Sequence, residues 1–431
     1  MARLKLVYVG GGSTRAPGTM ASLIAKGDAF AGSEVVLVDL DAERLALVER
    51  LARRMAAAAG VDLAVSSTTD RRAELDGCDA VLTSFRPGGF EHRVLDERIP
   101  LKHGVIGQET QGPGGFFMAL RAIKVMRELS DDVRAICPGA TVFNYTNPIN
   151  IVSEAMTRFS GLTTYSFCEG PIYEVRNAAH VAGVDPARVR IRMIGLNHGS
   201  WTVEARYGDE ELLPLIERRW EETRGEDLEP TYRRVLRIAA TMGSFPNSYL
   251  VYYYFRDELL AEALAKRTTR AEDILSQAPA YWRHYEEQAE QERPGLDPAR
   301  SRTGLDELEL ALDVMDAIYN DRGTTFPVNV PNNGSIPGLP DDLVVETTGR
   351  CDRDGIHPDS QQPLPRQVRG LVEMLAEYQV LAAEAAWKGT RRDGIRALAS
   401  NPLVVSLSKA EAIYDEMAAA HRDYLPDRLV A

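Results

Sequence analysis

Two side chains, a thiol and an imidazole, stand out in this chain because both are good ligands for a divalent metal. Cys168 lies in FCEGPI, residues 167–172, and His198 lies in GLNHGSW, residues 195–201. Each follows an apolar, strand-like run, so both are expected where a strand ends. Two ligands are too few to complete a metal site, and two oxygens of a bound substrate would fill the remaining positions. Taken singly, either residue is explained at least as well as part of a packed core.

The chain opens on a predicted strand that runs into a glycine turn, LKLVYVGGGSTR at residues 4–15. Small residues in that context let the backbone approach a pyrophosphate, which lies at the N-terminus of the following helix. Arg15 stands where the dinucleotide fingerprint has its third glycine. A second predicted strand ends at Asp39, where a carboxylate accepts hydrogen bonds from a ribose and favours NAD over NADP. An NAD site is therefore predicted, unless the turn binds no nucleotide, and its residues are Gly10, Gly12, Ser13, Thr14 and Asp39.

Further polar side chains gather in turns and near the ends of predicted strands. RPGGFEHR supplies Arg86 and Arg93, and a Gln-Glu-Thr run at residues 108–110 contains Glu109. YTNP places Asn147 directly after another predicted strand. Each of these residues is compatible with ordinary loop chemistry, and their number at strand ends is what indicates a binding site.

A stripe of tyrosines follows in SFPNSYLVYYYF, residues 244–255. Such a stripe is most often packing, with hydroxyl groups that find local partners. A phenol also serves as a general base when a nearby cation lowers its pKa. Tyr249 and Tyr253 are the two candidates for that role.

Short apolar runs alternate with helical patterns over the first 150 residues. This alternation predicts an α/β fold with a Rossmann-like, doubly wound parallel sheet. We expect an NAD-binding domain at residues 1–165 and a more helical α+β domain for catalysis, metal and substrate at residues 166–431. The segment 292–304 is the best candidate for a mobile loop. The predicted strands are 4–10, 34–40, 79–85 and 140–147, and the predicted helices are 43–60, 115–129 and 366–386.

Composition excludes several classes of protein. The chain has 431 residues and a formal charge of −13, which argues against nucleic-acid binding because phosphate recognition needs basic stripes. No run reaches roughly 18 apolar residues, so no spanning helix or membrane partner is expected. The first apolar stretch is strand-length and leads into a glycine loop, unlike a secretory signal. Four widely spaced cysteines are typical of a reducing cytoplasm, where we expect the protein to reside.

Taken together, these motifs resemble glycoside hydrolase family 4, the NAD- and metal-dependent glycosidases. The resemblance runs collinearly over roughly residues 4–350. The matching segments are GGGS, RPGG, PLKHGVIGQETQGPGGFFMALR, YTNPIN, CEGP, GLNH, SYLVYYY and VNVPNNG.

The resemblance implies an oxidoreductive way of cleaving a glycoside, with an architecture like that of lactate and malate dehydrogenases. NAD takes a hydride from C3 of the sugar, which acidifies the proton on C2. A tyrosine removes that proton, and a divalent metal, typically Mn²⁺, stabilises the enediolate through the C2 and C3 oxygens. The group at C1 is then eliminated, water adds, and the ketone is reduced back. This family is a known exception to the two-carboxylate mechanism of glycosidases.

By position, the resemblance assigns roles to residues of this chain. It makes Cys168 and His198 the metal ligands and Tyr249 the base, with Tyr253 as the alternative. Asn147 would contact the sugar hydroxyls, and Arg93 would grip an anionic group at C6, usually a phosphate. Glu109 is a further candidate for substrate binding. The implied substrate is a small anionic glycoside, and a homodimer or homotetramer is expected.

Two positions depart from the family pattern. Glu169 stands where Asn, Asp or His is common, and an acid there would protonate the leaving oxygen of an α-glycoside. Val251 stands where the 6-phospho-β-glucosidases commonly have Arg, and the missing cation weakens the case for a dianionic phosphate. A related NAD-dependent sulfoquinovosidase, acting on a 6-sulfonate, is therefore the closest alternative.

Two alternatives come from other classes of protein. An NAD-dependent 2-hydroxy-acid dehydrogenase has its catalytic histidine in a similar glycine context, but it would turn over free NAD. A regulatory protein would bind NAD and cleave no glycoside.

Overall fold

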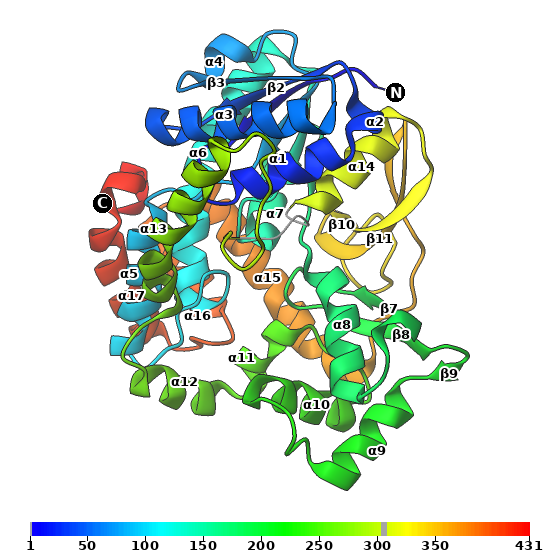
Figure 1. The fold of residues 1–431 in the computed structure, drawn as a ribbon. Helices are drawn as coiled ribbons and strands as arrows, with labels where there is room; N and C mark the ends of the chain where they lie inside the picture. Colours follow the sequence, from blue (N-terminus) through cyan, green and yellow to red (C-terminus); the bar gives the residue numbers. More distant parts are fainter. Residues whose placement is uncertain (1, 303–307) are drawn as a thin grey trace.

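Nine strands form one sheet through the centre of the computed structural model, which describes residues 2–302 and 308–431 (Figure 1). Six of them are parallel, in the order β3-β2-β1-β4-β5-β6, which is the order of dinucleotide-binding folds. The predicted Rossmann-like sheet is therefore confirmed. The parallel strands are β1 (Lys5–Val9), β2 (Ser33–Val38), β3 (Leu63–Thr68), β4 (Ala80–Thr83), β5 (Thr141–Asn144) and β6 (Thr164–Ser166).

The second half of the chain extends the same sheet. β10 (Thr324–Pro331) pairs antiparallel with β6, and β11 (Val344–Asp352) and β12 (Gly355–Pro358) follow outward. The boundary expected after residue 165 falls inside β6, so the two parts share a sheet, and their division into functional domains stays a prediction. A separate small sheet contains β7 (Val189–Ile194), β8 (Trp201–Tyr207) and β9 (Glu210–Glu211).

Helices cover both faces of the large sheet because its strands are apolar on both sides. Leu6 and Tyr8 of β1 belong to one buried cluster, whereas Val7 and Val9 belong to another. This follows from the two-residue period of a strand. The first cluster is closed by α1 (Ala16–Ala25), α3 (Ala42–Ala59) and α14 (Glu309–Tyr319). The second is closed by α6 (Gly112–Ile136), α7 (Ile149–Phe159), α15 (Arg366–Lys388), α16 (Arg391–Ser400) and α17 (Leu407–Ala420).

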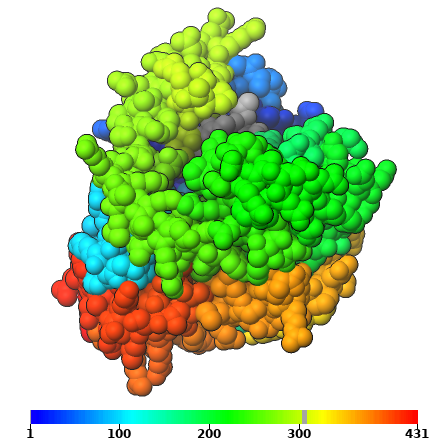
Figure 2. Space-filling model, turned by 90° about the horizontal axis from the view of Figure 1, so that it is seen from below, coloured from blue at the N-terminus to red at the C-terminus, as the bar shows by residue number. Residues whose placement is uncertain are grey.

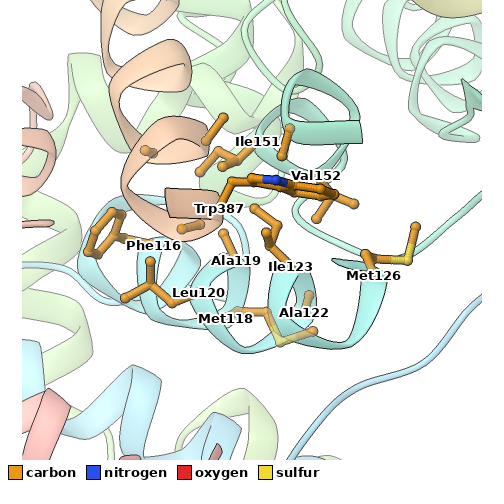
Figure 3. Close-up of a cluster of buried hydrophobic side chains, with 14 of the residues drawn as sticks. Phe116, Met118, Ala119, Leu120, Ala122, Ile123, Met126, Ile151, Val152 and Trp387 are labelled. Carbon is orange, nitrogen blue, oxygen red and sulfur yellow. The ribbon is translucent and has the colours of Figure 1, made fainter. Parts of the chain in front are cut away.

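The C-terminal helices are part of the core on this second face. Figure 3 shows Trp387 of α15 lying over Ala119 and Ile123 of α6 and beside Ile151 and Val152 of α7. The C-terminal helices thus cover one face of the sheet that contains β1, the first strand of the chain.

The remaining helices lie around these layers, and several of them form the lower part of the molecule in Figure 1. Seen from below, the green middle part of the chain covers the centre of that face, next to the orange and red C-terminal part (Figure 2). These helices are α2 (Gly27–Phe30), α4 (Arg71–Glu74), α5 (Gly89–Lys102), α8 (Gly170–Ala182), α9 (Leu213–Thr223), α10 (Pro230–Met242), α11 (Val251–Tyr254), α12 (Arg256–Ala265) and α13 (Arg270–Ala289).

Each strand and helix predicted from the sequence overlaps an observed element of the same type. The segment 292–304, predicted to be mobile, lies between α13 and α14, and its residues 303 and 304 lie outside the described residues. Among the described residues, no helix combines the length and the apolarity needed to cross a bilayer.

A buried charge network joins the C-terminal segment to α5 and α6. Arg121 donates two hydrogen bonds to Asp96, at 2.9 and 2.6 Å, and both side chains are fully buried. His421 Nε2 lies 3.1 Å from Asp96 Oδ1 without the alignment of a hydrogen bond, and Nδ1 of His421 lies 2.8 Å from Nδ1 of His92. Burial alone would raise the pKa of Asp96, but Arg121 and His421 hold it at about 2.

Arg121→Leu should lower the free energy of unfolding by about 3–5 kcal/mol, because it leaves the Asp96 carboxylate buried without its guanidinium partner. The matched control is Arg98→Ala, which breaks an exposed ion pair with Glu272 and should cost at most about 1 kcal/mol. Denaturant unfolding of both variants measures the difference. Equal losses would show that the Arg121 pair contributes no more than a surface pair.

Candidate functional site

The predicted site residues meet at the carboxyl edge of the parallel sheet, where ligands bind in such folds. Gly10 follows β1, Asp39 follows β2 and Arg86 lies just beyond β4. Asn147 follows β5, and Cys168 follows β6. Because these strands are neighbours, residues that are far apart in the sequence are brought to one edge.

The glycine turn is tied directly to the end of β2. The amides of Gly10 and Gly11 both donate to the carbonyl oxygen of Val38, at 2.8 and 3.0 Å. Gly10 has a φ of +103°, and a Cβ there would lie 2.1 Å from the carbonyl oxygen of Ser84, so no other residue fits. Asp39 accepts a hydrogen bond from the amide of Gly12 at 3.0 Å through Oδ2. Asp39 therefore shapes the loop, whatever it contributes to a ribose.

Cys168 and His198 lie together, as the sequence predicted. Sγ of Cys168 is 3.5 Å from Nε2 of His198, and Nδ1 of His198 is 2.9 Å from Oγ1 of Thr110. His198 has a φ of +62°, which turns its side chain back toward the thiol. Burial lowers the pKa of His198 to about 3, and burial followed by the charge of Glu346 raises the pKa of Cys168 to about 12.

These two residues fit a metal site that a substrate must complete. Among the described residues, no group of three or more His, Cys, Asp and Glu side chains is arranged to hold a metal ion. A cation between Sγ and Nε2 would favour the thiolate form of Cys168, since a positive charge offsets the burial that now disfavours it.

The structure distinguishes the two candidate tyrosines. The ring of Tyr249 stacks on that of His198, with centroids 3.9 Å apart and an interplanar angle of 4°. Its hydroxyl makes no hydrogen bond to any other described residue. Tyr253 is directed elsewhere, because its hydroxyl donates to Gln111. Burial raises the pKa of Tyr249 to about 12, with further contributions from Cys168 and Tyr252.

Arg93 and Glu109, both predicted to bind substrate, lie together and form an ion pair. Arg93 is 4 % exposed, donates to Glu97 Oε1 at 2.7 Å through Nε, and holds Nη1 2.7 Å from Glu109 Oε2. Arg86 pairs with the other oxygen of Glu109. Both guanidinium groups lie over the ring of Phe90, at 5.3 and 5.9 Å from its centroid.

Asn147 and Glu169 occupy the same edge with different surroundings. Oδ1 of Asn147 is buried without a hydrogen-bond partner among the described residues. Glu169 accepts hydrogen bonds from the hydroxyl of Tyr145 at 2.6 Å and from the amide of Leu310 at 3.2 Å. Glu169 is therefore held at the base of α14.

One residue that the sequence analysis missed is Glu346 of β11. Its carboxylate is 1 % exposed and accepts from Asn197 Nδ2 at 2.8 Å and from Ser200 Oγ at 2.7 Å, on either side of His198. The backbones of Glu346 and Gly195 also exchange two hydrogen bonds. Burial raises the pKa of Glu346 to about 7, against the hydrogen bonds of Asn197 and Ser200. In the sequence, the only signal for such a role was a charged residue directly after the apolar residues 343–345.

Comparison with known proteins agrees with this geometry. The pattern described as Family 4 glycosyl hydrolase matches residues 5–182, and that of the Family 4 glycosyl hydrolase C-terminal domain matches residues 193–404. The chain belongs to the family 4 glycosyl hydrolases. It is 36 % identical to a probable 6-phospho-β-glucosidase of Bacillus subtilis, over 98 % of this chain and 97 % of that protein. The resemblance found in the sequence is thereby confirmed.

Solved structures of family members are similar along the whole chain. A 6-phospho-α-glucosidase from gut microorganisms, in complex with NAD and Mn²⁺, has a TM-score of 0.87 at 27 % identity and covers 99 % of both chains. The 6-phospho-β-glucosidase of Thermotoga maritima, with NAD and glucose-6-phosphate, has a TM-score of 0.85 at 26 % identity, over 98 % of this chain and 99 % of that one. The predicted cofactors, NAD and Mn²⁺, are thus those found in solved family members.

The dehydrogenase-like architecture is confirmed as a fold. Malate dehydrogenase of Plasmodium falciparum has a TM-score of 0.55 at 13 % identity, over 89 % of this chain and all of that one. At that identity the likeness extends to the fold alone, so it gives no support to a 2-hydroxy-acid dehydrogenase activity.

Glu346→Ala should lower the free energy of unfolding by about 2–4 kcal/mol, because Asn197 and Ser200 lose their buried acceptor. Glu346→Gln should cost less, since the Oδ1 atom of Asn197 has no partner and can accept from the new amide after a flip. Hydrogen exchange at residues 195–200 should rise in the Ala variant. Glu373→Ala, at an exposed position of α15, is the control. Unchanged exchange in Glu346→Ala would show that the turn is held without this carboxylate.

Proposed function

We propose that this family 4 enzyme hydrolyses glycosides of a sugar with an anionic group at C6, with a 6-phosphoglucoside as the preferred substrate. The observation that carries the proposal is the stacking of Tyr249 on His198, beside Cys168, at the sheet edge that also carries the glycine loop. A phenol, two metal-binding atoms and a dinucleotide loop at one sheet edge are the groups that the oxidoreductive mechanism requires. The relatives named as 6-phospho-glucosidases support the substrate class.

The side chains at this edge of the sheet fit a divalent metal and NAD. Thr110 fixes the orientation of the His198 ring, so that Nε2 faces Sγ of Cys168. When bound, the metal supplies Lewis acidity for developing oxyanion charge, and NAD supplies a hydride acceptor. Ser13 Oγ lies buried in the glycine loop with no partner among the described residues, which suits a loop that awaits a ligand.

Tyr249 is the proposed base for the proton on C2. Its hydroxyl is free of hydrogen bonds to other described residues, and Arg93 and Arg15 already favour its ionised form. A cation near Cys168 and His198 would favour that form further. Because Tyr249 is held by stacking, its ring is oriented before a substrate arrives.

Asn147 and Glu169 have supporting roles in this proposal. The unpartnered Oδ1 of Asn147 is available to accept a hydrogen bond from a sugar hydroxyl. Glu169 stays the candidate for protonating the leaving oxygen. That role requires the protonated form of Glu169, whereas in the structure its carboxylate accepts a hydrogen bond from the hydroxyl of Tyr145.

A sulfonate at C6 is the second candidate anion. Val251 is 5 % exposed and packs in an apolar cluster, so it brings no cation to the site. The positive charge comes instead from Arg86 and Arg93, and two carboxylates, Glu97 and Glu109, balance it. Because these four side chains carry no net positive charge, they favour a monoanion, whereas the relatives favour a phosphate. The cytoplasmic location and the homodimeric or homotetrameric state remain predictions.

Aryl glycosides that carry 6-phosphate, 6-sulfonate, 6-carboxylate or a free 6-hydroxyl provide the direct test. With NAD and Mn²⁺ present, the 6-phosphate should be cleaved with the highest kcat/KM and the 6-hydroxyl hardly at all. No stoichiometric NADH should accumulate, because the hydride returns to the product in each cycle. A sulfonate preference would favour the sulfoquinovosidase alternative, and stoichiometric NADH release would indicate a dehydrogenase.

Tyr249→Phe should abolish proton abstraction and leave the fold intact, because it keeps the stacked ring and removes only the hydroxyl. Exchange of the C2 proton of the substrate in deuterated water measures that step, and a loss of about a hundredfold or more is expected for a missing general base. Tyr254→Phe removes the same group from the edge-to-face partner of Trp201 and should exchange normally. Normal exchange in Tyr249→Phe, with loss in Tyr253→Phe, would reassign the base.

A further inference from the structure

Glu109 differs from the other carboxylate that contacts Arg93. Within the described residues, the two oxygens of Glu109 contact only guanidinium groups, one from Arg86 and one from Arg93. Glu97, by contrast, lies within α5 and uses its second oxygen to accept from the amide of Ala271 at 2.9 Å. Glu97 is thus anchored between two helices, whereas Glu109 is anchored only by the arginines.

The backbone of Glu109 is also less constrained than that of Glu97. Residues 105–111 form a connection without helix or strand between α5 and α6. The side chain of Glu109 is 14 % exposed, compared with 7 % for Glu97 and 5 % for Arg93. Of the two carboxylates, Glu109 is therefore the one that can leave Arg93 without opening a helix interface.

Two guanidinium groups that converge on one carboxylate form a site for an oxyanion. Arginine binds phosphate, sulfonate and carboxylate groups through the same paired hydrogen bonds. Phe90 lies beneath both guanidinium groups and holds them in place. Glu109 is also followed directly by Thr110, whose Oγ1 lies 2.9 Å from Nδ1 of His198, so this oxyanion site belongs to the same edge of the sheet as His198.

We propose that Glu109 is an internal counter-ion, which occupies the position of the substrate's C6 anion between Arg86 and Arg93 and is displaced when the substrate binds. This inference rests on the proposed function, because it takes the C6 anion as the displacing group. In the free protein Glu109, together with Glu97, compensates the charges of Arg86 and Arg93. An incoming anion takes the place of Glu109, so the arginines are never left without a partner.

The segment that carries Glu109 also contacts the metal ligand and the tyrosine stripe. Thr110 contacts Nδ1 of His198, and Gln111 accepts from the hydroxyl of Tyr253. Displacement of Glu109 therefore acts on the segment that orients His198, and a substrate without an anion leaves that segment in its resting arrangement.

The test measures binding of inorganic sulfate, glucose 6-phosphate and glucose to the full-length protein by calorimetry, with NAD present, both with Mn²⁺ and after chelation. Glu109→Gln should bind sulfate and glucose 6-phosphate at least about tenfold more tightly than the wild type, because the competing charged acceptor is gone. Binding of glucose should not change. Glu97→Gln is the matched control, since it removes the same charge from the same arginine while Glu109 stays in place.

The outcomes separate the inference from the proposed function. Equal tightening in Glu109→Gln and Glu97→Gln would reduce the effect to net charge and overturn the inference, and so would weaker binding in Glu109→Gln. If the wild type binds glucose as well as glucose 6-phosphate, the proposed substrate class fails instead.

A measurement on the wild type does not depend on the variants folding. Adding glucose 6-phosphate should change hydrogen exchange at residues 105–111, whereas glucose should leave it unchanged. Binding of glucose 6-phosphate without any change in that segment would overturn the inference.

Discussion

The hydrogen bonds from Asn197 and Ser200 to the buried carboxylate of Glu346 are the interaction on which the site depends. Glu346 lies on β11, which belongs to the same nine-stranded sheet as β6, the strand that leads to Cys168. The turn that carries His198 lies between β7 and β8, which belong to the small sheet. By binding this turn on both sides of His198, Glu346 fixes the imidazole relative to the thiol. The distance between Sγ of Cys168 and Nε2 of His198 is thus set by the sheet.

At the same edge, three consecutive residues contact three different parts of the site. Glu109, Thr110 and Gln111 are consecutive, and they contact the arginine pair, His198 and Tyr253 respectively. A segment without regular structure can do this because its side chains are not confined to one face. The arginine pair, His198 and the tyrosine segment are consequently linked by three adjacent residues.

Local signals in the sequence were sufficient for the parallel sheet and the glycine turn, because strand alternation and close backbone packing act over a few residues. The positions of Cys168 and Asn147 followed, since each comes directly after a predicted strand. Glu346 was missed because its role depends on a bridge to Gly195 and on a hydrogen bond from Asn197, 149 residues earlier, and both become visible only once β11 is placed. Which of Tyr249 and Tyr253 lies against His198 likewise required three-dimensional contacts, because both lie in one short helical stretch.

The unsatisfied polar groups at the edge of the sheet indicate what the fold is built to receive. Ser13 Oγ and Asn147 Oδ1 are buried without partners among the described residues. An unpaired buried group costs about 1–3 kcal/mol, so a fold tolerates few of them unless a ligand completes them. Ser13 lies in the glycine turn after β1, and Asn147 follows β5, the neighbour of β6, which leads to Cys168. Their placement at one edge, one in the glycine loop and one on the strand next to that of Cys168, is what a site completed by cofactor and sugar requires.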